Sequence, residues 1–138
     1  AHSPDALERV LAALRPLVPG ELVVLFGCGG DRDRGKRPLM ARAAARGADR
    51  LVLTSDNPRS EDPEAILDAM QGGLAGESTP WTRVADRAEA IAAAVTSARP
   101  GDLVLLAGKG HEATQEIDGR KFPLDDRVEA RAALEAWR

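Results

Sequence analysis

Apolar residues occur along the chain in two patterns that alternate with each other. Short continuous runs bounded by glycine, proline or charged residues predict buried strands. Three strong runs and one weak run of this kind lie at residues 22–26, 51–53, 103–106 and 81–84. Between them, apolar residues recur three or four positions apart, which predicts helices over residues 4 to about 19, 36–46, 63–70, 86–98 and 126 to about 137. Because strands alternate with helices, the sequence predicts an α/β fold, a Rossmann-like and mostly parallel sheet with helices on both faces.

The last part of the chain carries a different signal. Asp118 and Gly119 separate two short segments, 116–117 and 121–122, and an Asp-Gly pair in this setting predicts a β-hairpin. We expect the hairpin to add an antiparallel edge to the sheet. The chain shows no repeat or linker, and its 138 residues suffice for one domain, residues 1–138, with its own core.

Charge and composition narrow the range of partners. The net charge is −3 and aromatic residues make up 3% of the chain. We expect no nucleic-acid partner, because the chain has no basic field and few side chains that could stack on bases. No apolar run is long enough to span a bilayer, which predicts no membrane association. Cys28 is the only cysteine, as is typical of a reducing compartment such as the cytoplasm. We expect a monomer.

The segment after the second strong strand, residues 54–61, contains an acid, an amide and an arginine around a proline. Pro58 fixes its own φ and disfavours helical geometry at Asn57, so the loop is stiff. Asp56 and Arg59 offer a ligand one negative and one positive group, which suits a zwitterion such as an amino acid. The alternative is that the segment only caps the next helix, but capping requires neither the amide nor the arginine.

The loop after the first strand has the spacing of a phosphate-binding loop but lacks part of its chemistry. Gly30 to Lys36 supplies a glycine, four residues and Gly-Lys, whereas Arg37 stands where a serine or threonine should hold magnesium. The dinucleotide-binding fingerprint fails as well, because Arg32 occupies the place of its third glycine. The alternative is a glycine turn followed by charges at a helix start, with Asp33 as a cap.

The loop after the third strong strand places Lys109, His111 and Glu112 beside two glycines, which let the backbone approach a ligand closely. His111 could serve as a general base or make a structural hydrogen bond to the backbone. We expect no metal site, because His2 and His111 are the only histidines and no ligand spacing recurs. Glu112 is a natural acceptor for an ammonium group. These three loops are called here the first loop (residues 27–38), the second loop (54–61) and the third loop (107–112). In a parallel sheet all three share the edge at which such folds bind ligands.

Five motifs, in their order and spacing, resemble the C-terminal domain of Mur ligases of the MurE type. These are the UDP-N-acetylmuramoyl-L-alanyl-D-glutamate–2,6-diaminopimelate ligases of peptidoglycan synthesis. The motifs are AHSPDAL from Ala1, GCGGDRDRGKRP from Gly27, DNPRSE from Asp56, GKGHE from Gly108, and Asp125-Asp126-Arg127. The resemblance covers the whole chain. One departure lies near Thr114, where the family usually has an aromatic residue.

The resemblance implies ATP-driven synthesis of an amide bond. ATP phosphorylates the D-glutamate side-chain carboxylate of UDP-N-acetylmuramoyl-L-alanyl-D-glutamate. The amine of meso-diaminopimelate then attacks the acyl phosphate, assisted by Mg²⁺ and a carbamylated lysine. The family's UDP-binding and central ATPase domains precede this one, and the chain begins at Ala1 without an initiator methionine, as if cut from something longer. The resemblance therefore implies no catalytic residue in this chain and an inactive isolated fragment.

Matching the motifs residue by residue also implies contacts to meso-diaminopimelate. Arg59 would bind the carboxylate that lysine lacks, because a guanidinium pairs bidentately with a carboxylate and family members that use lysine replace this arginine. The Gly108 carbonyl and Glu112 would face the ammonium at the far stereocentre. The implied substrate-binding residues are Arg32, Asp56, Asn57, Pro58, Arg59, Gly108 and Glu112, with His2 near ATP.

The residues alone leave two other functions open. One is a stand-alone α/β module that binds an amino acid or a nucleotide without catalysis. The other is a small kinase that uses Gly30 to Lys36, against which Arg37 counts. Magnesium-dependent ATP binding by the isolated chain would favour the kinase.

Overall fold

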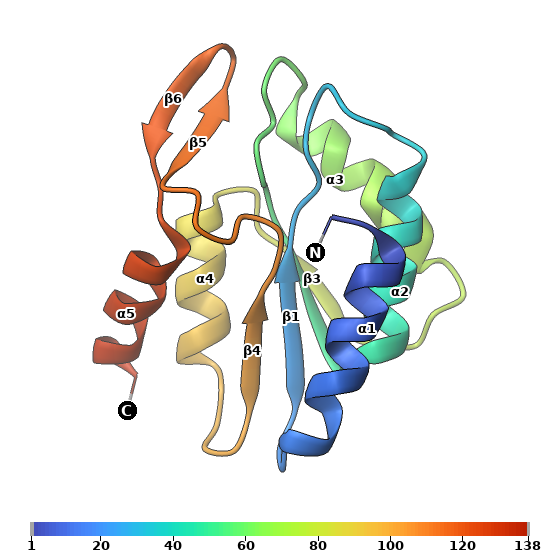
Figure 1. Ribbon diagram of the computed structural model, residues 1–138, viewed down its shortest axis with the longest axis vertical. Helices are drawn as coiled ribbons and strands as arrows, with labels where there is room; N and C mark the ends of the chain where they lie inside the picture. Colours follow the sequence, from blue (N-terminus) through green and yellow to red (C-terminus); the bar gives the residue numbers. More distant parts are fainter. Residues whose placement is uncertain (1, 138) are drawn as a thin grey trace.

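A four-stranded, fully parallel sheet forms the centre of the molecule in the computed structural model, which describes residues 2–137 (Figure 1). Its strands are β1 (Leu22–Phe26), β2 (Arg50–Leu53), β3 (Trp81–Arg83) and β4 (Leu103–Leu106). Their order is β3-β2-β1-β4, so the chain reverses its direction of travel across the sheet after β3. This reversal creates a switch point between β1 and β4, where open α/β sheets bind ligands.

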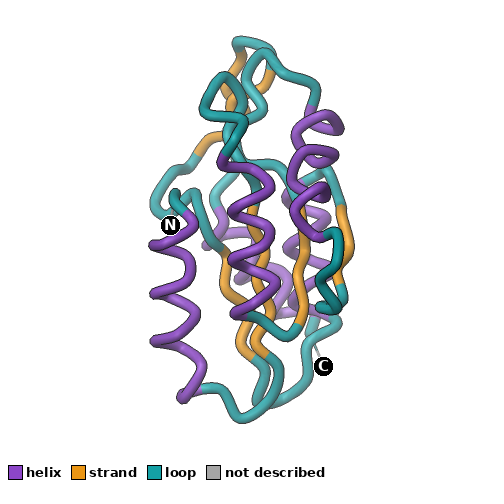
Figure 2. The backbone as a smooth tube through the Cα atoms, turned by 90° about the vertical axis from the view of Figure 1, so that its right-hand side faces the viewer, coloured by secondary structure: helices purple, strands orange, loops and turns teal. Residues whose placement is uncertain are grey.

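Helices cover both faces of the sheet, as predicted (Figure 2). One face carries α1 (Pro4–Leu14), α2 (Lys36–Gly47) and α3 (Pro63–Gln71), and the other carries α4 (Arg87–Thr96) and α5 (Asp126–Ala136). Successive side chains of a strand point to opposite faces. Val24 therefore joins the core under α1, α2 and α3, whereas Val23 and Leu25 join the core under α4 and α5. The predicted fold class is confirmed.

Among residues 2–137, a capping side chain stands at the start of every α-helix except α2. Ser3 accepts a hydrogen bond from the amide of Ala6 at 3.1 Å. Asp62 accepts one from the amide of Glu64 at 2.9 Å, so the helix after the second loop has its own cap. Capping thus accounts for Asp62 and leaves Arg59 unexplained.

The first helix is shorter than predicted. Its α-helical part ends at Leu14, and a 3₁₀ turn, Arg15–Leu17, follows. Pro16 causes this change, because proline has no amide to donate to the preceding turn. Leu17 is consequently 72% exposed. Within residues 2–137, no helix combines the length and the apolar character needed to cross a membrane.

The hairpin forms as predicted but lies elsewhere than expected. Its strands, β5 (Thr114–Ile117) and β6 (Arg120–Pro123), make a sheet of their own, which stands beyond the carboxyl ends of the parallel strands (Figure 1). Gly108, with φ of +107°, turns the chain before β5. The hairpin then pairs with the second loop, where the amide of Arg59 donates to the Glu116 carbonyl at 2.9 Å.

Candidate functional site

A cavity of about 500 Å³ opens at the carboxyl ends of β1, β2 and β4. Residues of all three glycine- and charge-rich loops line it, which confirms that these loops share one edge. The cavity is lined by six residues proposed from the sequence, His2, Arg32, Asp56, Asn57, Arg59 and Glu112.

Pro58 and Gly108, the other two residues proposed from the sequence, do not line the cavity. They lie where its loops pack against each other. Pro58 is buried against Gly30, and a Cβ on Gly30 would come within 1.8 Å of the Pro58 carbonyl oxygen. The amide of Gly30 also donates to the carbonyl of Asn57 at 2.7 Å. A Cβ on Gly108 would lie 3.0 Å from Asp56 Oδ2, so this glycine lets the third loop approach the second.

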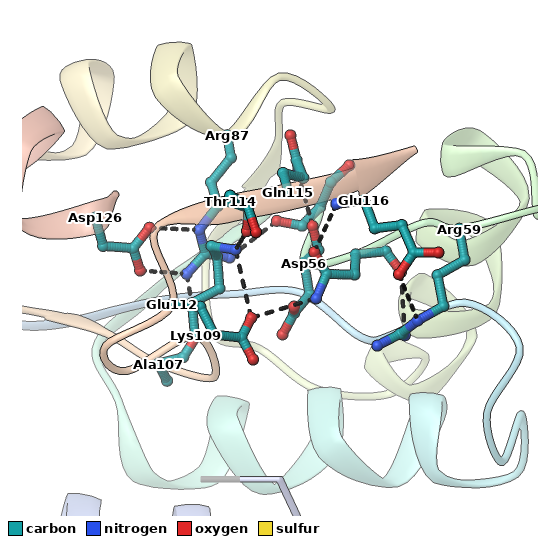
Figure 3. A network of polar contacts seen from close by, with 12 residues as sticks. Asp56, Arg59, Arg87, Ala107, Lys109, Glu112, Thr114, Gln115, Glu116 and Asp126 are labelled. Atoms are coloured by element: carbon teal, nitrogen blue, oxygen red, sulfur yellow. Dashed lines mark hydrogen bonds and ion pairs between the residues drawn. The ribbon is translucent and has the colours of Figure 1, made fainter. Parts of the chain in front are cut away.

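Arg59 projects its side chain between the first loop and the hairpin (Figure 3). Its Nη1 donates to the carbonyl of Gly30 at 3.0 Å and lies 3.5 Å from that of Asn57. Its Nε lies 3.6 Å from Oε1 of Glu116, and the side chain is 20% exposed. A guanidinium has five N–H donors. Among residues 2–137 these contacts do not use Nη2, which leaves this nitrogen able to bind a ligand.

Asp56 is a buried acid, and its burial and its neighbours act on its charge in opposite directions. Burial raises the pKa of its carboxyl above the usual 3.8, because the charged form loses its water. The positive charges of Arg87 and Lys109 act in the opposite direction. The side-chain nitrogen Nε2 of Gln115 holds the Asp56 backbone by donating to its carbonyl at 2.7 Å. A buried carboxylate of this kind is suited to a cationic ligand group.

Glu112 and Asn57 meet across the cavity. The Asn57 side-chain nitrogen donates to Oε1 of Glu112 at 3.3 Å, and the Asn57 oxygen accepts from the amide of Glu116 at 2.9 Å. Lys109 is buried, and its ammonium donates to the Thr114 carbonyl and lies 3.5 Å from Oε1 of Glu112. Lys109 therefore positions the third loop and Glu112, which the sequence did not indicate.

Three backbone amides of the first loop are already bonded within the protein. The amide of Asp31 donates to Glu61 at 2.6 Å, that of Gly35 donates to Asp33 at 2.9 Å, and that of Gly30 faces the second loop. These three amides are not available to a phosphate, which counts against a phosphate-binding loop. The suggested role of Asp33 as helix cap was wrong, because its bond closes a turn before α2, which has no side-chain cap.

Arg37, which breaks the phosphate-loop pattern, is buried and has a structural role. It forms a two-pronged pair with Glu61, at 2.6 Å and 3.1 Å, and donates to the Gly29 carbonyl at 3.1 Å. The hydrogen bonds from Arg37 lower the pKa of the Glu61 carboxyl most, the bond from the Asp31 amide adds to this effect, and the pKa is about 2. This pair links the start of α2 to the second loop.

Four side chains of the cavity were missed by the sequence reasoning. They are those of Cys28, Asp33, Lys36 and Met40. Lys36 and Met40 are four residues apart and so share one helix face, a signal that was available once α2 was placed. Burial raises the pKa of the Cys28 thiol to about 12, so this group is neutral and unsuited to nucleophilic chemistry.

The arrangement favours binding over catalysis. Arg32, Lys36 and Arg59 supply positive charge, while Asp56 and Glu112 supply negative charge. Residues 2–137 contain no cluster of three or more histidine, cysteine, aspartate or glutamate side chains placed to hold a metal. His111 is exposed and outside the cavity lining. The site can therefore hold a small molecule that carries several charges of both signs.

Comparison with known proteins gives a consistent result. Residues 1–110 match the family model described as "Mur ligase, glutamate ligase domain". The UDP-N-acetylmuramoyl-L-alanyl-D-glutamate–2,6-diaminopimelate ligase of a Synechococcus species is 56% identical over 138 residues, all of this chain and 28% of the relative. The ligase of the same name from Pseudomonas putida is 55% identical over 137 residues, 99% of this chain and 27% of the relative.

A solved structure of a ligase with this name matches 99% of the chain and 28% of its own length, with a TM-score of 0.92 and 51% identity. The chain thus spans about a quarter of the length of these relatives.

Proposed function

Because the chain belongs to the Mur ligase family, matching its glutamate ligase domain, we propose that it is the amino-acid-binding domain of a meso-diaminopimelate-adding ligase. The complete enzyme would join meso-diaminopimelate to UDP-N-acetylmuramoyl-L-alanyl-D-glutamate in cytoplasmic peptidoglycan synthesis. One observation carries the proposal: a cavity at the switch point that interleaves arginine and lysine with buried and half-exposed carboxylates. meso-Diaminopimelate has two carboxylates and two amino groups, which this pattern of charge complements.

In the proposed reaction, this domain binds and orients the nucleophile. Arg59 and Arg32 pair with substrate carboxylates, and Arg59 presents its Nη2 for this purpose. Asp56, Glu112 and the Gly108 carbonyl receive the ammonium at the far stereocentre. Holding that end leaves the other amine directed out of the cavity, toward the acyl group it attacks. Fixed orientation of this kind converts binding into a lower barrier.

The remaining chemistry requires parts outside this chain. ATP, bound with Mg²⁺, supplies the phosphoryl group that activates the D-glutamate carboxylate. The amides of Gly30, Asp31 and Gly35 in the first loop are already bonded and are not available to its phosphates. We assign the nucleotide and the UDP-linked substrate to the UDP-binding and central ATPase domains that precede this one, with His2 as the residue nearest to ATP.

The test uses the complete ligase that contains this domain. Purified enzyme is supplied with ATP, Mg²⁺, the UDP-linked dipeptide and either meso-diaminopimelate or L-lysine, and the tripeptide product is quantified by mass spectrometry. We expect efficient product formation with meso-diaminopimelate and poor formation with lysine. Equal or preferential use of lysine, or no amide product with either, would refute the proposal.

A further inference from the structure

Arg87, the first residue of α4, is the largest fully buried side chain of the molecule among the described residues and joins three elements. Its Nε and Nη2 donate to the two carboxylate oxygens of Asp126, at 2.8 Å and 2.7 Å. Its Nη1 donates to the Ser55 carbonyl at 2.9 Å, and its Nη2 also donates to the Ala107 carbonyl at 3.2 Å (Figure 3). All three nitrogens are therefore in use.

Each of the two backbone acceptors lies directly before a residue of the proposed amino-acid site. Ser55 immediately precedes Asp56, and Ala107 immediately precedes Gly108. β2 and β4 are not neighbours in the sheet, because β1 lies between them. No ladder between these two strands therefore sets the distance between the second and third loops, and within residues 2–137 the backbone bonds from the hairpin reach the second loop only at Arg59. Arg87 links them directly across the switch point.

Stability alone does not explain such a pair. Replacing a buried ion pair by apolar residues of similar size is often neutral or stabilising, because desolvating two charges offsets their attraction. Arg87 is 1% exposed and Asp126 is 5% exposed, so this pair carries the full desolvation cost. What the apolar alternative would lack is the donors that hold the Ser55 and Ala107 carbonyls.

We propose that Arg87 is a positioning residue of the amino-acid site, which holds the second and third loops at the spacing that meso-diaminopimelate requires and directs positive charge at Asp56. This inference rests on the proposed function. Asp126 has the complementary role: it orients the guanidinium and neutralises part of its charge. Neither side chain contacts the substrate.

The proposal has an electrostatic consequence at Asp56. The charged or titratable groups that face this carboxylate are Arg87 from α4, Lys109 and Glu112 from the third loop, Cys28 from the first loop, and His2 before α1. Arg87 is the strongest of those that oppose the rise in pKa caused by burial. Its removal should raise the pKa of Asp56 further. Removing the charge of Asp126 should lower that pKa, because Arg87 would then be less neutralised.

The experiment compares variants of the complete ligase by the KM for meso-diaminopimelate across pH, with the KM for ATP as internal reference. In Arg87→Met we expect the KM for meso-diaminopimelate to rise about 10- to 100-fold, the scale of a misplaced binding group. The acidic limb of its pH profile, the range in which protonation of Asp56 weakens binding, should move to higher pH. In Asp126→Asn, which keeps shape and an acceptor oxygen, the acidic limb should move to lower pH. The ATP KM should remain within about twofold, well below that scale.

Two further variants separate positioning from folding. The double variant Arg87→Met/Asp126→Leu replaces the pair by apolar groups and should remain folded, yet its amino-acid KM should still rise. Arg83→Met is the matched control, since Arg83 pairs with Glu64 and Asp68 at the surface away from the cavity, and both KM values should stay unchanged. An unchanged amino-acid KM in the folded double variant, or acidic limbs that move in the same direction, would overturn the inference.

The proposed function can fail separately. If the wild-type ligase forms no product with meso-diaminopimelate, the loops are compared by hydrogen exchange in the wild-type and double-variant proteins. Faster exchange at residues 54–59 and 107–112 in the double variant would support the positioning role, and equal exchange would refute it.

Discussion

Under the proposed function, Arg59 would bind the second carboxylate of the substrate. Carbonyls of the first and second loops hold its guanidinium from one side, and Nη2 is available to a ligand. In the complete ligase, Arg59→Ala should cost meso-diaminopimelate about 2–5 kcal/mol in kcat/KM, the scale for removing one side of a buried charge pair. Lysine, which has no carboxylate at that position, should lose far less. Steady-state kinetics with both amino acids measure the change in selectivity.

Glu112→Ala provides the comparison, because both amino acids present an ammonium group to this carboxylate. It should weaken both substrates similarly. Equal losses for the two amino acids in Arg59→Ala would instead show that Arg59 only supports the loop through Gly30.

The sequence predicted those site residues that follow directly from the ends of strands. Asp56 and Glu112 were found in this way. Arg87 was not, because an arginine at the start of an alanine-rich helix resembles a solvent-exposed residue. Its burial depends on Asp126, 39 positions later, which the sequence analysis named only as part of the motif Asp125-Asp126-Arg127. Such a contact depends on tertiary structure and leaves no local pattern.

At the scale of the elements, the first and second loops pack so closely that there is no space for a side chain at Gly30. In Gly30→Ala the new Cβ would lie 1.8 Å from the Pro58 carbonyl oxygen, so one of the two loops must move. We expect a loss of about 1–3 kcal/mol in the free energy of unfolding, as for overpacking elsewhere, together with weaker amino-acid binding. Urea unfolding followed by circular dichroism gives the first quantity.

Gly72→Ala is the matched control for Gly30→Ala. Gly72 lies at the end of α3 with helical geometry, and a Cβ there meets no atom within 4 Å. This variant should be neutral or slightly stabilised. A similar loss of stability in both variants would mean that Gly30→Ala acts through the loss of glycine's backbone flexibility and not through the contact with the Pro58 carbonyl.

The pair of Arg37 and Glu61, which joins α2 to the second loop, predicts a dependence of stability on pH. The pKa of Glu61 is about 2 in the folded chain, below the 4.5 of an ordinary glutamate. The pair therefore stabilises the fold fully above pH 4.5, and this contribution is lost as the pH falls toward 2. Unfolding free energies between these pH values should fall less steeply in Arg37→Met than in the wild type. Equal slopes of unfolding free energy against pH in the two proteins would show that other carboxylates dominate the pH dependence.

The hairpin shows how far local signals extend. The Asp-Gly turn was predicted correctly, and Asp118 and Gly119 both adopt positive φ, at +52° and +76°, as such a turn requires. Its attachment to the second loop was not predicted. That attachment depends on the bend at Gly108 and on bonds to Arg59, which is distant in sequence.

For the whole molecule, the handedness of chain crossings explains why the site is where it is. Crossovers between parallel strands are almost always right-handed. β1, β2 and β3 follow one another in one direction, which places α2 and α3 on one face. The step from β3 to β4 runs the other way, so α4 lies on the opposite face and the switch point falls between β1 and β4. The alternation of elements was visible in the sequence, whereas the reversal was not.

The two cores predict that the isolated chain folds but does not ligate. Both faces of the sheet are covered by packed helices, as independent folding requires. Against activity, the amides of Gly30, Asp31 and Gly35 are engaged within the described structure and not available to ATP phosphates. Arg37 also stands where a phosphate loop needs a serine or threonine to hold magnesium. A cooperative thermal transition by circular dichroism would establish folding. Phosphate release with ATP, the UDP-linked dipeptide and meso-diaminopimelate should stay at background, with the complete ligase as positive control. Turnover by material shown to be free of host ligase would mean that this domain binds ATP by itself and that the division of labour between domains is wrong.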